Sequence, residues 1–341
     1  MARTVTIVGG GAAGMTAAGQ LARSGIEVVL VEKESVTGGH VKEWHHLFPD
    51  RRDSNEVVRF LESQVNHKSI IIIRGDQAEA IEKKGKKFIL TTASGKEITS
   101  DAILLATGFD LFRSSRKEEY GYGIYENVIT SADLEVMFRN GGPVMKNGNK
   151  PGKAGIIHCV GSRDEKAGNL YCSKLCCITA VKQAMEIKDS LNDARVFCFY
   201  MDMRMGGAMY EEIYRDAQEN YGISFIRGKV SEVSENFNNK LVVKVEDTLL
   251  GRPLKMELDM LILMAGMEMA EGGKKLAASA GLKTGQNRFF APADNHFGNN
   301  LSNIRGIFYA GTCTAPMNIT ETISHSRSAV LEIVEYLRNE R

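Results

Sequence analysis

The chain has 341 residues, enough for a large buried core and for two domains. It carries 43 Lys and Arg against 42 Asp and Glu, and this balance gives no basic field that would favour nucleic acid or an anionic membrane as a partner. Its 6 cysteines are unevenly clustered, which indicates metal or redox chemistry rather than a disulfide scaffold.

The N-terminus and the apolar stretches give no sign of export or of a membrane span. MARTVTIVGGG enters a strand pattern at once, with no room for a charged segment, an apolar segment and a cleavage site, so we expect a cytoplasmic protein. The most apolar later stretch, Leu258 to Gly266, is far shorter than the ~20 residues that cross a bilayer. A buried strand explains it better.

The opening of the chain predicts a βαβ unit. TVTIV indicates a strand, GGGAAG a turn, MTAAGQLARSG a helix and EVVLVEK a second strand, and such apolar strands are typical of a parallel sheet covered on both faces. We then expect a helix over residues 55–66, a strand in SIIIIRG, an antiparallel excursion, and a buried strand from Ala102 to Ala106.

The middle of the chain predicts a second unit of the same architecture. The sequence from Phe109 to Lys153 is polar, aromatic and Gly-rich, which favours a crossover between domains over a core. A second strand–loop–helix follows in GIIHCVGS and CITAVKQAMEIK, then a strand in ARVFCFYM, a helix over residues 209–221 and a strand in ISFIRG. LDMLILMAG, GIFYAGT and a helix over residues 319–338 complete the pattern. We expect an α/β protein with one domain made of residues 1–112 and 271–341 and another made of residues 113–270.

The glycine turn after the first strand has the G-x-G-x-x-G spacing of a dinucleotide site. Gly9 permits the tight turn, Gly11 lets the backbone approach a pyrophosphate, and Gly14 lets helix and strand pack closely. Glu32 ends the second strand, where a carboxylate can accept both hydroxyls of an adenosine ribose. We therefore expect a dinucleotide at the N-terminus of this helix.

Three further segments indicate that the dinucleotide is FAD. Gly38-Gly39, the stretch from Leu104 to Gly108, and IFYAGT together resemble the flavoproteins with two dinucleotide-binding domains, the fold of glutathione and thioredoxin reductases. The resemblance implies two Rossmann-like domains, with a helix end that faces the flavin. Where that family has an acid after the late glycine, this chain has Thr312, so a hydroxyl replaces the carboxylate that would contact the ribityl chain. The expected FAD contacts are Gly9, Gly11, Ala12, Ala13, Gly14, Glu32, Lys33, Gly38, Gly39, His40, Ala78, Ala106, Thr107, Gly108, Gly311, Thr312, Asn318, Ile319 and Thr320.

Four cysteines occupy the second strand–loop–helix, where such reductases bind nicotinamide. After GIIHC no second or third glycine follows at the spacing of a pyrophosphate cradle, and the thiols form a C-x12-C-x3-C-C pattern of Cys159, Cys172, Cys176 and Cys177. A [4Fe–4S] cluster is favoured, because successive residues at a helix start can reach different irons. A structural zinc site, a redox dithiol and buried unreactive thiols remain as alternatives, although zinc usually takes C-x2–4-C pairs and the C-x-x-C motif of a dithiol is absent.

The cysteine spacing and three other segments resemble one family. WHHLFP after Gly-Gly-His, the YGYG crossover and DMRMGGAMYEEIYRDAQ are similar to the A-subunit family of heterodisulfide reductases, flavoproteins with a cluster in a thioredoxin-reductase-like core. Its methanogenic members carry added ferredoxin domains, for which this chain has no cysteines left, so it most resembles the compact A-like subunit of heterodisulfide-reductase-like complexes in sulfur oxidisers. The resemblance implies FAD, a [4Fe–4S] cluster held by the four thiols above, a homodimer, B- and C-like iron–sulfur subunits as partners, and a link to lipoate-bound sulfur and NAD.

Other conspicuous residues have simpler interpretations. Cys198 lies in an apolar strand and is expected in the core, and no second cysteine accompanies Cys313. His45-His46 has no acidic or thiol ligand at helical spacing, so we expect a loop contact or a surface pair. The methionines between residues 201 and 209 are expected to pack at an interface. The cations that could raise the reduction potential of a cluster, or else form a solvated surface, are Arg163, Lys174 and Lys182.

Together these features predict an electron-transfer flavoprotein, an oxidoreductase that exchanges electrons with a partner protein. No triad, zinc signature or nucleophile elbow suggests hydrolysis. Two alternatives are an NAD(P)H-dependent disulfide reductase that uses two of the clustered thiols, and a FAD-binding scaffold subunit with a structural zinc site.

Overall fold

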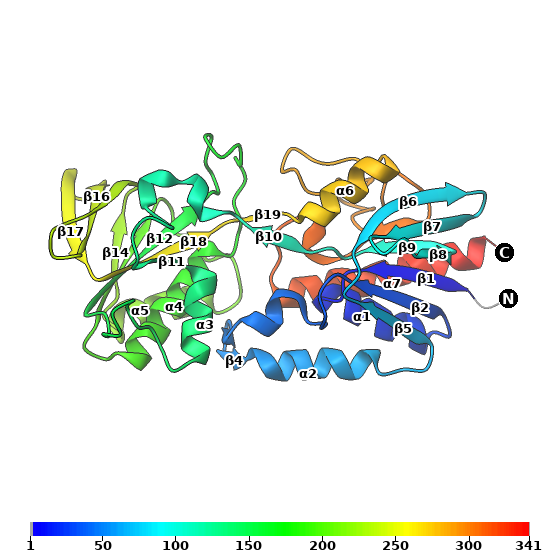
Figure 1. Cartoon of the computed structure of the whole chain (residues 1–341), viewed down its shortest axis with the longest axis horizontal. Coiled ribbons are helices and arrows are strands. Elements are labelled where there is room, and N and C mark those ends of the chain that lie inside the picture. The colour runs from blue at the N-terminus through cyan, green and yellow to red at the C-terminus, as the bar shows by residue number, and fades with distance from the viewer. Residues whose placement is uncertain (1–2, 341) are drawn as a thin grey trace. The chain divides into compact units, whose positions relative to one another are not determined.

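Residues 3–340 of the computed structural model divide into two units. Of these described residues, the first unit comprises 3–42, Ser54–Asp110 and 268–340, and the second comprises Glu43–Asp53 and Leu111–Met267. The chain passes between them through β10 (Phe109–Leu111) and β19 (Met267–Met269), two short strands that pair with each other (Figure 1). None of the helices in the described part of the chain is both long and apolar enough to span a membrane.

The first unit is built on a parallel sheet in the order β20-β9-β1-β2-β5. Helix α1 packs against this sheet and against two other helices, α2 and α7. The bounds are β1 (Thr4–Val8), β2 (Glu27–Glu32), β5 (Ile70–Arg74), β9 (Ala102–Leu105), β20 (Ile307–Tyr309), α1 (Ala12–Arg23), α2 (Ser54–Val65) and α7 (Ile319–Asn339). Every residue of β9 is buried, which explains why this strand is a continuous apolar run.

A three-stranded antiparallel sheet and one helix complete the first unit. The sheet, in the order β6-β7-β8, is the excursion that the sequence predicts, and α6 packs on β6. Their bounds are β6 (Ala78–Lys84), β7 (Lys87–Thr92), β8 (Glu97–Ser100) and α6 (Glu271–Ala280). Short 3₁₀ helices lie at η1 (Gly39–Glu43), which ends at the boundary with the second unit, and at η4 (Gly311–Cys313).

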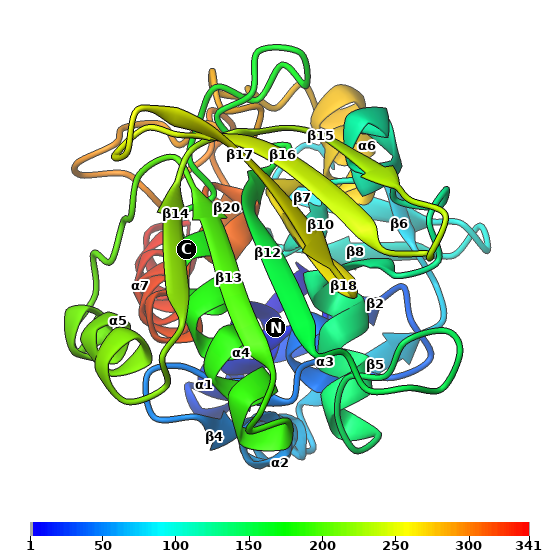
Figure 2. The same ribbon diagram turned by 90° about the vertical axis from the view of Figure 1, so that its left-hand side faces the viewer.

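The second unit repeats the architecture with a parallel sheet in the order β11-β18-β12-β13-β14. An antiparallel sheet, β15-β16-β17, covers one face, and helices cover the other, as Figure 2 shows with this unit toward the viewer. The bounds are β11 (Val128–Thr130), β12 (Lys153–Val160), β13 (Arg195–Tyr200), β14 (Ser224–Arg227), β15 (Val230–Glu235), β16 (Leu241–Asp247), β17 (Arg252–Leu258), β18 (Met260–Ala265), α3 (Ser131–Arg139), α4 (Cys176–Ser190) and α5 (Tyr210–Glu219).

Side chains along the strands of the second sheet point alternately to its two faces, and each face packs into a separate hydrophobic core. Ile156 and Ile262 pack with α3 and α4, in a cluster that also holds Cys176 and Cys177. The next residue of β12, Ile157, faces the antiparallel sheet instead. Because successive side chains of a strand point to opposite faces, a strand buried on both sides is mainly apolar, as β18 is throughout and β12 is apart from Lys153 and His158.

Two parts of the sequence prediction need correction. The stretch from 109 to 153, expected as a polar crossover, contains two 3₁₀ turns, η2 (Ser114–Arg116) and η3 (Glu118–Tyr120), and also supplies β11 and α3 to the second core. The short run VIT was too brief to be recognised as a strand. Residues 43–53, expected in the first domain, belong to the second unit, because their strands β3 (His46–Leu47) and β4 (Arg52–Asp53) lie in a segment bonded to α3 and α4.

Candidate functional site

The glycine turn of the first unit is shaped by contacts that only glycine allows. Gly9 has φ +107°, and a Cβ atom there would collide with the carbonyl of Ala106 at the end of β9. A Cβ at Gly14 would collide with the carbonyl of Gly9, so α1 approaches β1 too closely for any other residue. These two contacts fix the turn and bring the start of α1 over the carboxyl end of the sheet.

Gly11 differs from its neighbours because the space beside it is open. It is the N-cap of α1 with φ −81°, and the nearest atom to a Cβ there would be the Cα of Gly39, 3.8 Å away. No side chain caps this helix, and its first turn holds no acidic residue. The amide groups at the helix start therefore face open space with a positive partial charge, the arrangement that binds a pyrophosphate.

Glu32 is buried at the end of β2 and is held in place by the backbone. Its Oε2 accepts a hydrogen bond from the amide of Gly10 at 2.6 Å, and its Oε1 accepts one from the amide of Glu34 at 2.9 Å. Each carboxylate oxygen keeps a further lone pair for a ribose hydroxyl. The neighbouring Lys33 side chain is 57% exposed and lies 3.9 Å from Glu34, so it forms part of the surface.

Two further loops reach the same turn from within the first unit. Gly39 lies against Gly11, since a Cβ on Gly39 would be 3.1 Å from the Gly11 Cα. His40, next to it, stacks on Phe109 with ring centroids 4.5 Å apart and bonds the Phe109 carbonyl through Nε2 at 2.9 Å. The expected loop 38–40 is therefore beside the helix start.

The C-terminal segment closes the candidate dinucleotide site. A Cβ on Gly311 would lie 2.8 Å from the Cβ of Ala13, and a Cβ on Gly108 would lie 3.9 Å from the Thr312 hydroxyl. Asn318 caps α7 by accepting the amide of Glu321 at 2.8 Å, which leaves Ile319 and Thr320 in the first turn of that helix. The structure thus brings together the predicted residues of the loops after β1, β9 and β20. In the loop after β9, Thr107 has a buried hydroxyl with no hydrogen-bond partner. Ala78, the predicted residue outside these loops, is buried at the start of β6.

The second candidate site lies at the end of β12 and the start of α4. Cys159 adopts φ +58°, a left-handed conformation rare for a non-glycine residue, next to an irregularity in the pairing of β12 with β18. Cys176 and Cys177 open α4 and are buried, while Cys172 is half-buried in the preceding loop. Because of this strained conformation, the side chain of Cys159 lies on the same face of the sheet as that of Ile156, whereas regular alternation would place it on the face of Ile157.

The four thiols lie close enough to influence one another electrostatically. A hydrogen bond with Cys176 lowers the pKa of Cys159 despite burial, and Arg163 and Arg204 lower it further. The same contact and burial raise the pKa of Cys176, with further increases from Cys177 and Cys172. Burial raises the pKa of Cys177 to about 11. In the described residues no three of these sulfur atoms lie within 4.8 Å of one another.

Backbone amides and arginines surround these sulfur atoms. The amide of Lys174 donates to the Cys172 sulfur at 3.2 Å, and the amide of Arg204 donates to the Cys177 sulfur at 3.5 Å. Arg163 interacts with the charges of Cys159 and Cys172 and bonds Asp202 at 2.6 Å. Such donors and cations, together with the N-terminus of α4, favour anionic sulfur.

Sequence reasoning located Arg163 here but missed Arg204 and misplaced Lys182. Arg204 comes from the loop after β13, and proximity along the chain gave no signal for it. Lys182 points away from the thiols and is buried with Glu135, to which its Nζ donates at 2.6 Å. A lysine five positions after Cys177 lies on a different face of the helix.

The turn after β12 differs from a nucleotide cradle in its packing. Gly161 has φ +77°, and a Cβ there would collide with the ring of Phe112. The hydroxyls of Ser162 and Ser173 bond each other beneath it. This glycine therefore accommodates an aromatic side chain of its own unit, whereas the open side of Gly11 accommodates none.

The remaining cysteines are core residues. Cys198 lies in β13 and is completely buried, as expected, and burial raises the pKa of its thiol. Cys313 is also buried, and its thiol donates to the carbonyls of Leu105 at 3.2 Å and Ala310 at 3.3 Å. The Cys198 thiol is enclosed by the core, and the Cys313 thiol has backbone carbonyls as hydrogen-bond acceptors, so neither needs a second cysteine as a partner.

Comparison with solved structures confirms the predicted fold. The thioredoxin reductase of T. acidophilum matches with a TM-score of 0.69 at 19% identity and covers 99% of this chain and 100% of that one. The thioredoxin reductase of Lactococcus lactis matches with a TM-score of 0.70 at 17% identity over 99% of both chains. The chain therefore has the thioredoxin-reductase-like fold of two Rossmann-type domains.

Sequence comparison identifies the family. The model of the family described as pyridine nucleotide-disulphide oxidoreductase matches residues 3–135. The chain is 40% identical over 239 residues to the A-subunit of the H(2):CoB-CoM heterodisulfide,ferredoxin reductase of Methanothermobacter thermautotrophicus, covering 68% of this chain and 36% of that protein. It is 32% identical to an iron-sulfur A-subunit of the CoB--CoM heterodisulfide reductase of Methanopyrus kandleri, covering 96% of this chain and 63% of that protein. The chain thus spans 36% to 63% of the length of these relatives, and it belongs to the A-subunit family of heterodisulfide reductases.

Proposed function

We propose that this chain is an electron-transfer oxidoreductase subunit of a heterodisulfide-reductase-like complex, with FAD in the first unit and a [4Fe–4S] cluster in the second. The observation that carries the proposal is the group of four thiols around the start of α4, in the place where the fold usually binds nicotinamide. The relatives named above are subunits of heterodisulfide reductases, and one is called an iron-sulfur subunit. The sulfur-oxidiser subtype, the homodimer and the B- and C-like partners stay predictions from the sequence.

The residues of the first unit fit FAD. Gly11 and the uncapped amides of α1 would hold the pyrophosphate, and Glu32 would hold the adenosine ribose. The first turn of α7 would offer its positive end to the flavin ring. A methyl group at Gly11 would occupy the open space that the pyrophosphate needs.

The residues of the second unit fit a [4Fe–4S] cluster better than they fit one zinc ion. Four thiolates around a zinc, with Zn–S bonds of about 2.3 Å, place their sulfurs about 3.8 Å apart. Cys159 and Cys176 share a hydrogen bond, but no third of these sulfurs joins them within 4.8 Å in the described residues, whereas one zinc ion needs all of its sulfur ligands that close together. Cluster ligands each bind a separate iron and stand further apart. The amides of Lys174 and Arg204 would donate to ligand sulfurs, and Arg163 and Arg204 would offset their charge.

When bound, FAD would exchange electrons either in pairs or singly and the cluster would exchange them singly, so the two groups together would connect a two-electron partner to a one-electron partner. The protein's part is to bind, orient and shield them. No acid–base side chain is required for outer-sphere electron transfer, which agrees with a site made of backbone donors, thiols and arginines.

Anaerobic purification followed by metal, sulfide and flavin analysis tests the proposal. We expect FAD together with about four iron atoms and about four acid-labile sulfides per chain, the content of one cubane. Stepwise reduction followed by electron paramagnetic resonance should reveal a cluster signal. Zinc without iron would contradict the cluster, and rapid bleaching of the flavin by NADH or NADPH alone would favour the disulfide reductase alternative.

A pair of cysteine variants separates ligand loss from general damage. Cys177→Ser should lose iron and sulfide, because a ligand at the start of α4 is removed. Cys198→Ala removes a thiol that is fully buried in β13 and should retain the wild-type iron content. Equal iron content in both variants would rule out Cys177 as a ligand.

A further inference from the structure

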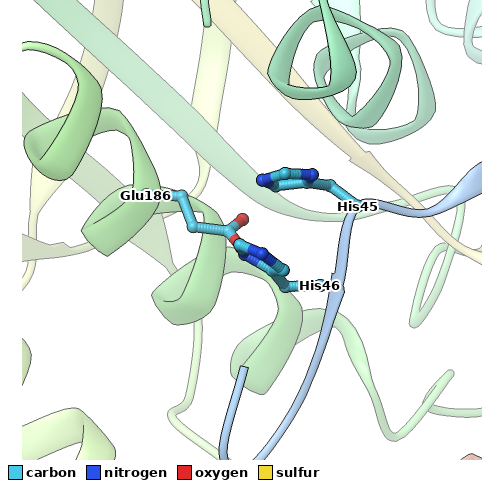
Figure 3. A group of neighbouring side chains, drawn as sticks. All are labelled: His45, His46 and Glu186. Carbon is cyan, nitrogen blue, oxygen red and sulfur yellow. The ribbon is translucent and has the colours of Figure 1, made fainter. Parts of the chain in front are cut away.

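Two adjacent histidines and a distant glutamate meet in the second unit. His45 and His46 lie in the segment Glu43–Asp53, and Glu186 lies on α4, 140 residues further along the chain than His46. In Figure 3 the two imidazole rings and the carboxylate point toward one another. One ligand atom from each residue lies within 4.8 Å of the other two. No sequence pattern indicated this group, because the acid that joins the histidines is remote from them in the chain.

The histidines are held on both sides by the same buried ion pair. The amide of His45 donates to Glu135 Oε2 at 2.8 Å, and Lys182 Nζ donates to the carbonyl of His46 at 2.8 Å. Glu135 and Lys182 bond each other and are both about 5% exposed or less. The backbone of the two histidines is therefore fixed before any ligand binds, which lowers the entropy cost of binding one.

The spacing of donor atoms suits a small divalent ion. His46 Nδ1 lies 2.9 Å from Glu186 Oε1, where a proton now bridges the two atoms. Ligand atoms on a tetrahedral zinc, with bonds of about 2.0–2.1 Å, stand about 3.3 Å apart, so a metal ion can replace this proton with a small displacement. The ring of His45 is tilted by 35° from that of His46, with centroids 3.7 Å apart, and completes the set of two imidazoles and a carboxylate.

Charge and burial also suit a cation. Glu186 is only 5% exposed, and its Oε2 accepts no hydrogen bond, with Lys182 Nζ 3.4 Å away. One ammonium thus faces two carboxylates, Glu135 and Glu186, so the group carries an excess negative charge when both are ionised. The His46 side chain is 32% exposed, which gives an ion access from solvent.

We propose that His45, His46 and Glu186 form a binding site for a divalent transition-metal ion, with Zn²⁺ as its ordinary occupant and a fourth position open to water. Two imidazoles and a carboxylate are the ligands of open zinc sites, whereas closed structural sites use four protein ligands. This site is independent of the proposed cluster, because it uses no thiol.

Zinc titration of the purified full chain, with its own cofactors bound and in competition with a chromophoric chelator, tests the site. Glu186→Gln and His46→Gln should each weaken zinc binding at least tenfold, since each removes one ligand. His296→Gln is the matched control, because His296 is an exposed histidine of the first unit and should leave the affinity unchanged. The same affinity in all four proteins would overturn the proposal.

X-ray absorption at the zinc edge gives an answer that does not depend on the variants folding. With less than one equivalent of zinc on the wild-type chain, we expect nitrogen and oxygen ligands at about 2.0–2.1 Å and no sulfur. A sulfur shell at about 2.3 Å would place the zinc on the cysteines and overturn the proposal. If the purified protein contained no iron, the proposed cluster would be rejected, but the zinc-edge result would still decide whether the histidine site exists.

Discussion

The ring of Phe112 occupies the space that a side chain on Gly161 would need. Phe112 is 2% exposed, and its ring also lies under the guanidinium of Arg116 at 4.4 Å. In a nucleotide-binding turn the corresponding glycine leaves room for a pyrophosphate. Here that room is filled by the protein itself, and the turn serves packing and the orientation of Cys159.

This relationship predicts that Gly161→Ala destabilises the second unit more than other glycine substitutions do. The left-handed φ costs about 1–2 kcal/mol, and overpacking against Phe112 adds about 1–3 kcal/mol. Gly148→Ala is the control, since Gly148 has φ +82° but nothing within 4 Å of its Cβ position. Urea unfolding should show the larger loss for Gly161→Ala, and equal losses would mean that Phe112 moves away at no cost.

A second prediction separates dinucleotide binding from folding in the first unit. Gly11→Ala should leave the stability of the apoprotein within about 0.5 kcal/mol of wild type, because φ is −81° and the space is open. The added methyl group should nevertheless weaken FAD binding at least tenfold by blocking the approach of the pyrophosphate. Fluorescence titration of the apoprotein with FAD measures this, and unchanged affinity would place the pyrophosphate elsewhere.

Gly14→Ala is the contrasting variant. Its Cβ would collide with the Gly9 carbonyl, so α1 would have to move away from β1. We expect loss of thermal stability without FAD as well as with it, because the damage is to packing. A variant that folds normally and loses only FAD would contradict this assignment of roles.

The local sequence predicts much of this structure because local chemistry sets it. The turn Gly9–Gly14, the strand end at Glu32 and the helix that opens at Cys176 depend on residues within one βαβ unit, and the structure has these elements as expected. The short strand β11 was missed because three residues carry too little pattern, and only pairing with β18 makes it a strand.

Partners that are remote along the chain escaped prediction for a different reason. Glu186 meets His46, and Arg204 meets Cys177, through the packing of α4 against separate loops. A single sequence contains no signal for such pairings. Lys182 shows the opposite error. Its closeness to Cys177 in sequence suggested that it lies near the thiols, but the helical period places its side chain beside Glu135 instead.

A third prediction concerns the pH dependence of stability in the loop that carries the cysteines. Lys117 donates to Asp164 Oδ2 at 2.7 Å, and their side chains are 4% and 6% exposed. Although burial alone would raise it, bonds from Lys117 and the Ala167 amide hold the pKa of Asp164 below its ordinary 3.8. Because the folded-state pKa is depressed, the stabilisation is fully present above the unfolded value and is lost as pH falls below about 3.8 through the folded value.

Asp164→Asn should therefore lower the free energy of unfolding by about 2–3 kcal/mol at pH 7, where Glu119 still pairs with the buried ammonium of Lys117. The difference from wild type should shrink as pH falls below 3.8. Glu165→Gln changes an exposed acid in the same loop and should have no comparable effect. A deficit of constant size down to acid pH would show that the ion pair is not its cause.

The last prediction uses two arginines that share one carboxylate. Arg163 Nη2 bonds Asp202 Oδ2 at 2.6 Å, and Arg227 Nη2 bonds Oδ1 of the same residue at 3.3 Å. Arg163 also interacts with the charges of Cys159 and Cys172. If the proposed cluster is bound there, Arg163 stabilises its more negative, reduced form, and Arg227 serves as a control with the same partner.

Arg163→Gln should then lower the midpoint potential of the cluster by about 30–60 mV, a three- to tenfold change in a one-electron equilibrium. Arg227→Gln should shift the potential much less, although it also releases part of the charge of Asp202. Potentiometric titration followed by electron paramagnetic resonance compares the two. Equal shifts would show that the effect passes through Asp202, whereas a shift confined to Arg163→Gln would show that the guanidinium acts on the cluster directly.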